Sequence, residues 1–84
     1  MTFDIHRAAL DRFGLHAQML QTCEECAELQ QALLHHLRGR QSDVVGEIAD
    51  VLIMAGQMRL AFGTEEVDRA VEMKLARLKE RLNG

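Results

Sequence analysis

Apolar residues recur at steps of three and four along most of this chain, a spacing typical of amphipathic helices. Hydrophobic residues make up 48% of the 84 residues, which is enough to build a core, and proline is absent. No segment reads as a strand rich in Val, Ile and Thr between two turns. We therefore expect an all-α fold, and the length predicts one domain over residues 1–84.

Glycines divide the apolar pattern into four expected helices, joined by short connections. The expected helices cover, in order, residues 2–13, residues 15–37, residues 43–62 and a segment that follows Gly63. Ser42 or Asp43 is the expected N-cap of the third helix, and Thr64 that of the fourth. The apolar stripe of the fourth helix consists of Val67, Val71, Leu75, Leu78 and Leu82.

The third segment is apolar around more than half of its circumference. Such a helix should be central in the fold and can also contact another subunit. Gly46 and Gly56 lower its helix propensity by about 1 kcal/mol each. Glycine at these two positions could permit close packing against a neighbouring helix.

The charge balance disfavours several kinds of partner. Thirteen acidic and ten basic residues give a formal charge of −3, so the chain lacks the basic surface expected of a nucleic-acid-binding protein. No apolar run reaches 18 residues, so we expect no membrane span. The N-terminal residues lack the layout of a signal peptide, and we expect a cytoplasmic protein.

Two pairs of acidic residues stand out from this helical pattern. Glu25 and Glu28 lie three residues apart in the second segment, and Glu47 and Asp50 lie three apart in the third. Residues at this spacing share one face of a helix, where like charges repel each other. Each pair therefore needs a physical explanation.

The second pair is the more informative, because Glu47 and Asp50 are embedded among Val, Ile and Leu residues. Buried carboxylates are unfavourable unless they are paired or bind a metal, and oxygen ligands suit magnesium and manganese. An antiparallel second and third helix would bring both pairs to one site. Spacing alone does not separate a metal site from an ordinary solvated acidic face.

The order and spacing of these motifs resemble a known family. Glu25-x-x-Glu28, a gap of 18 residues and Glu47-x-x-Asp50 are similar to the pattern of the MazG-like all-α nucleoside triphosphate pyrophosphohydrolases. The segments Gly46-Glu47-Ile48-Ala49-Asp50-Val51 and Val71-Glu72-Met73-Lys74-Leu75-Ala76-Arg77-Leu78 also look like parts of that family. The resemblance covers nearly the whole chain and implies a four-helix, bundle-like fold assembled as a dimer or tetramer.

The resemblance also implies an activity and a site. The reaction would be hydrolysis of a nucleoside triphosphate to the monophosphate and pyrophosphate, with Mg²⁺, or Mn²⁺ in its place, as cofactor. The metal ligands carried over are Glu25, Glu28, Glu47 and Asp50. Glu24 or Glu25 is the candidate catalytic base, Lys74 and Arg77 are candidate phosphate donors, and Gln21 and His35 are possible substrate contacts.

Several alternatives remain open at this point. Lys74 and Arg77 could form an ordinary basic edge of the last helix, and the Asn that often accompanies them in the family is missing. A phosphoribosyl-ATP pyrophosphohydrolase would show a similar acidic pattern, and a non-catalytic helical interaction module is the alternative from another class. Cys23 and Cys26 form a CxxC motif that we expect to be buried in the core, in preference to a zinc or redox site.

Overall fold

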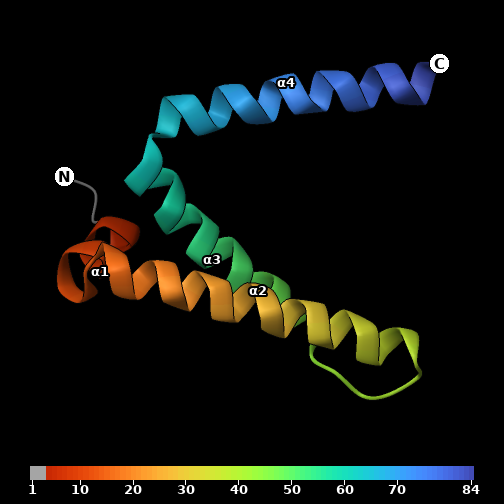
Figure 1. Cartoon of the computed structure of the whole chain (residues 1–84), viewed down its shortest axis with the longest axis horizontal. Helices are drawn as coiled ribbons and strands as arrows, with labels where there is room; N and C mark the ends of the chain where they lie inside the picture. Colours follow the sequence, from red (N-terminus) through yellow and green to blue (C-terminus); the bar gives the residue numbers. More distant parts are fainter. Residues whose placement is uncertain (1–3) are drawn as a thin grey trace.

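The computed structural model describes residues 4–84, and this range contains four α-helices and no strand (Figure 1). The helices are α1 (Ile5–Phe13), α2 (Leu15–Leu37), α3 (Val44–Phe62) and α4 (Thr64–Asn83). The all-α prediction is confirmed, and the four helices match the predicted segments closely. The expected start of the first helix at Thr2 lies outside the described residues.

Aspartate side chains cap two of the four helices. Asp4 accepts a hydrogen bond from the backbone N–H of Arg7 at 3.1 Å, and Asp43 accepts one from Gly46 at 3.0 Å. Each bond satisfies a backbone donor that the first helical turn leaves free. The N-cap prediction for α3 is thus confirmed at Asp43, the second of the two expected positions.

The prediction that Thr64 caps α4 is wrong. Thr64 is already the first residue of the helix, and Gly63 occupies the N-cap position with φ +116°. A residue with a side chain would be strained at this angle, whereas glycine adopts it readily. The single residue Gly63 therefore ends α3, starts α4 and sets the direction in which α4 leaves.

α2 and α3 run antiparallel and form the main contact of the fold (Figure 1). Near one end, Gln18 Nε2 donates to Gln57 Oε1 at 2.6 Å, and both side chains are buried. At the other end, Ser42 Oγ donates to the backbone carbonyl of Ala32 at 2.9 Å. These two bonds hold the helices in register and satisfy polar groups that would otherwise be buried without partners.

α1 packs across α3, where Gly56 allows a close approach. A Cβ atom at this position would lie 2.8 Å from Nε2 of His6, well inside van der Waals contact. Gly56 therefore makes room for the His6 ring, as expected for a glycine that permits helix packing. Leu10 on α1 and Met54 on α3 are among the few buried apolar side chains of the described residues.

α4 extends away from the other helices as a single arm (Figure 1). Among the described residues it contacts only α3, and none of its side chains is buried. Asp68 accepts two hydrogen bonds from the Arg59 guanidinium, at 2.7 and 2.6 Å, and these bonds hold the arm beside the end of α3. The same hydrogen bonds lower the pKa of Asp68. A closed four-helix bundle is therefore not formed within one chain.

Much of the apolar surface stays exposed because the arm does not fold back. The predicted core position of Cys23 and Cys26 is wrong, since both thiols are free and exposed on α2. The stripe predicted for α4 is also exposed from Val71 to Leu82.

In residues 4–84, no helix combines the length and the hydropathy that crossing a membrane requires.

Candidate metal centre

Three carboxylates converge where α2 and α3 lie side by side. Glu25 on α2 and Glu47 and Asp50 on α3 each offer one oxygen atom, and these three oxygens all lie within 4.8 Å of one another. The antiparallel arrangement of the two helices brings the two acidic motifs together. Both motifs predicted from the sequence thus contribute to one acidic cluster, which consists of Glu25, Glu47 and Asp50.

Two oxygens of this cluster lack any hydrogen-bond partner. Oε2 of Glu25 and Oε2 of Glu47 are buried atoms to which no described residue donates a hydrogen bond. A buried, unpaired carboxylate oxygen is unfavourable, because it has lost its water without gaining a donor or a cation. Among the described residues, these two oxygen atoms are therefore the ones that most need a cation beside them.

The other oxygen of Glu25 is already fixed. Gln21, one helical turn earlier, donates from Nε2 to Oε1 of Glu25 at 2.8 Å. A hydrogen bond to one carboxylate oxygen orients the group and leaves the second oxygen available as a ligand. Gln21 was predicted as a possible substrate contact; the structure places its amide on the carboxylate of Glu25.

Glu28 lies close to the acidic cluster but is not one of its three members. The negative charge of Glu25, followed by that of Glu47, raises the pKa of Glu28 above its usual value. The cause is repulsion between like charges, which disfavours the ionised form. A cation at this position would remove the repulsion, so Glu28 is suitably placed to be a fourth ligand.

Asp50 differs from the sequence expectation in its exposure. We expected both Glu47 and Asp50 to be shielded by their apolar neighbours, yet Asp50 is exposed and Glu47 is half-buried. The neighbours Val45, Ile48 and Leu52 are exposed as well. The acidic cluster is thus buried on the side of α2 and open on the side of Asp50.

A groove of about 460 Å³ adjoins the carboxylates at the end of α2. Its lining residues are Glu28, Gln31, Ala32, His35, Ser42, Asp43 and Glu47. His35, a predicted substrate contact, therefore lies in a groove shared with Glu28 and Glu47. Gln31 and Asp43 were not predicted, although Gln31 lies one turn after Glu28 and so shares its face of the helix.

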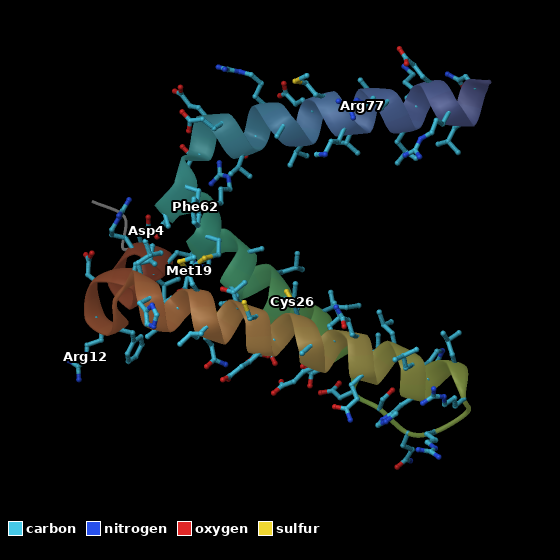
Figure 2. The ribbon with its side chains drawn as sticks, in the orientation of Figure 1. Asp4, Arg12, Met19, Cys26, Phe62 and Arg77 are labelled. Carbon is cyan, nitrogen blue, oxygen red and sulfur yellow. The ribbon has the colours of Figure 1, made fainter. Side chains whose placement is uncertain are left out.

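Three of the predicted site residues lie apart from this centre. Glu24 is exposed on α2 and does not belong to the acidic cluster. Lys74 and Arg77 lie on α4, which has no contact with α2, and Figure 2 shows Arg77 far along the arm. Within one chain the structure does not bring these two basic residues to the carboxylates.

The donor set suits a hard divalent cation. All available ligand atoms are carboxylate oxygens, with no thiol or imidazole in the cluster, and this favours magnesium or manganese over zinc. No protein-family model, no curated protein and no solved structure matches this chain. The resemblance drawn from the motifs therefore stays a prediction.

Proposed function

We propose that the chain is a magnesium-dependent nucleoside triphosphate pyrophosphohydrolase, which releases a nucleoside monophosphate and pyrophosphate. The observation that carries this proposal is the pair of buried, unpartnered oxygens of Glu25 and Glu47. The motif resemblance supplies the reaction, and the groove beside Glu28 supplies a space next to the carboxylates for part of a substrate.

The proposed metal ligands are Glu25, Glu47 and Asp50, with Glu28 as the fourth. A bound Mg²⁺ would supply charge neutralisation at the phosphate oxygens and activation of a water molecule. Gln21 holds Glu25 in place through its hydrogen bond. Of the two candidates for the catalytic base, Glu24 lies outside the acidic cluster, so Glu25 is the better placed to accept a proton.

We also propose that the chain acts as a homo-oligomer. Lys74 and Arg77 do not reach the carboxylates of their own chain, because beyond Asp68 the arm extends away from both α2 and α3 (Figure 1). If either residue binds substrate phosphates, it does so at the site of another copy. The large exposed apolar surface of the single chain supports this association.

The test is product analysis with a panel of ribo- and deoxyribonucleoside triphosphates in the presence of Mg²⁺. We expect a monophosphate and pyrophosphate from at least one of them, and no turnover after addition of EDTA. Glu47→Gln and Asp50→Asn should lose at least 100-fold in turnover, in the range expected when a metal-binding or catalytic group is removed. Glu80→Gln and Asp11→Asn are matched controls on exposed positions outside the centre and should retain full activity.

Two results would overturn the proposal. One is a complete lack of turnover with every nucleotide tested. The other is turnover that Glu47→Gln and Asp50→Asn retain at the wild-type level, since the acidic cluster would then have no part in the reaction.

A further inference from the structure

The single chain exposes more surface than a folded monomer of its size. Its accessible surface is 6912 Å², whereas a compact protein of 9.5 kDa exposes about 5,000 Å². Its radius of gyration is 15.7 Å, against about 12 Å expected for this length. The excess of about 1,900 Å² exceeds the area of about 800 Å² that each partner buries in a stable interface.

Exposed apolar side chains lie on all four helices, and on two helices that do not contact each other they form a continuous stripe. On α4, Val71, Leu75 and Leu78 are 49%, 58% and 43% exposed, and Leu82 continues the same stripe. On α2, a second stripe of exposed residues follows steps of three, four and seven, and we call it the outer face of α2: Met19, Cys23, Cys26, Leu33 and Leu37. Figure 2 places Met19 and Cys26 on the edge of α2 that is turned toward α4.

We propose that two copies of this chain exchange their α4 arms, so that the α4 stripe of each copy packs along the outer face of α2 of the other. This inference specifies the contact behind the self-association that forms part of the proposed function. The reciprocal contact would give a two-fold symmetric dimer in which the same pair of surfaces meets twice.

The two surfaces match in length and in apolar character. At 1.5 Å per residue, the 20 residues of α4 span about 30 Å and the 23 residues of α2 about 35 Å. At about 100° per helical residue, Glu24, Glu25 and Glu28 lie more than 100° around α2 from the centre of its outer face, so that face is apolar like the α4 stripe.

The arm is held in a position from which it cannot cover its own α2. Gly63 directs α4 away from the pair of α2 and α3, and the exposed ion pair between Arg59 and Asp68 links the start of α4 to α3 in that direction. The α4 arm that covers the outer face of α2 is therefore that of a second copy of this chain.

Because each helical residue turns by about 100°, Lys74 borders the α4 stripe and Arg77 faces away from it. Lys74 is thus the basic residue that exchange brings nearer to the partner.

The native thiols of the outer face provide a direct test. Leu75→Cys places a third thiol on the α4 stripe, and a disulfide forms only when Cβ atoms approach to about 3.5–4.5 Å. After mild oxidation of a mixture of ¹⁴N- and ¹⁵N-labelled chains, we expect Leu75→Cys to link to Cys23 or Cys26 of another chain. Met73→Cys, on the opposite side of α4, is the matched control and should remain unlinked. Changing Cys23 and Cys26 to Ser should abolish the link.

Sedimentation equilibrium of the wild type and of Leu78→Glu complements the cross-linking. We expect a wild-type dimer and at least a 10-fold weaker association of the variant. A monomeric wild type, links within one chain, or equal linking by Met73→Cys would overturn the proposal. A dimer in which Leu75→Cys forms no link would overturn the arm exchange alone. All samples contain EDTA and no nucleotide, so none of these outcomes depends on the metal centre or the enzymatic activity.

Discussion

The Oε2 atoms of Glu25 and Glu47 are both buried where α2 meets α3, and no described residue donates a hydrogen bond to either one. Asp50 adds a third carboxylate oxygen within 4.8 Å of the oxygens that these two residues offer. Negative charges held this close destabilise a fold unless a cation joins them. The metal-free protein should therefore be less stable than variants that relieve this repulsion.

Replacement of Glu47 by Gln should stabilise the metal-free protein. The substitution removes one negative charge, and the new amide supplies a hydrogen-bond donor. We therefore expect the free energy of unfolding to rise by about 1 kcal/mol in EDTA. Urea denaturation followed by circular dichroism measures this change, and Glu80→Gln is the control. Added Mg²⁺ should stabilise the wild type through binding to the folded state, and should stabilise Glu47→Gln less because the variant binds the ion more weakly. A variant less stable than the wild type in EDTA would contradict the account.

Gln21→Ala should weaken metal binding without removing a ligand. The amide of Gln21 orients Glu25 through a 2.8 Å hydrogen bond, and loss of such a supporting bond typically weakens metal affinity by about 10- to 100-fold. A titration with Mn²⁺ followed by electron paramagnetic resonance measures the affinity. Gln41→Ala, in the exposed turn between α2 and α3, is the control. Unchanged affinity in Gln21→Ala would show that this hydrogen bond has no role in the site.

The pH dependence of stability should reveal the position of Glu28. Its pKa is raised in the folded state, so the folded protein binds this proton more tightly than the unfolded chain does. The contribution of protonated Glu28 to stability is complete below pH 4.5, the ordinary pKa of this group. It is lost as the pH rises through the higher pKa of Glu28 in the folded state. In EDTA, the melting temperature of the wild type should therefore fall across this window relative to that of Glu28→Gln. A constant difference between the two proteins would contradict the assignment.

The ends of the helices could be predicted from the sequence because local residues determine them. Gly14, Asp43 and Gly63 act within one turn of the chain, and the structure confirms the boundaries they indicate. The convergence of Glu25 with Glu47 could be predicted once a short connection made α2 and α3 antiparallel. These features depend on spacing and on the nearest elements alone.

Other features could not be predicted, because they depend on how the helices are oriented in space. The direction of α4 follows from the backbone angle at Gly63 and from the ion pair between Arg59 and Asp68. The apolar pattern of the sequence predicts neither of these features. We therefore expected a bundle with Cys23 and Cys26 in its core, whereas both are exposed. The exposure of Asp50 has the same origin, since no helix of its own chain covers that side of α3.

Gly56 and His6 offer a test of the packing between α1 and α3. In a helix, Gly→Ala normally adds about 0.8–1.0 kcal/mol of stability. At Gly56 the new methyl group would meet the His6 ring at 2.8 Å, so this gain should be lost in the wild-type background. In the His6→Ala background, Gly56→Ala should recover most of it. A double-mutant cycle by urea denaturation measures the coupling, and additive effects would show that the two residues do not meet.

The central claim is that the carboxylates between α2 and α3 hold a divalent cation, and direct metal binding tests it most simply. Mn²⁺ should bind to the wild-type protein and be displaced by Mg²⁺. Glu47→Gln and Asp50→Asn should bind Mn²⁺ at least 10-fold more weakly, while Asp11→Asn should bind it as the wild type does. If the wild type binds no Mn²⁺, or if Glu47→Gln binds it with unchanged affinity, the acidic cluster is not a metal centre.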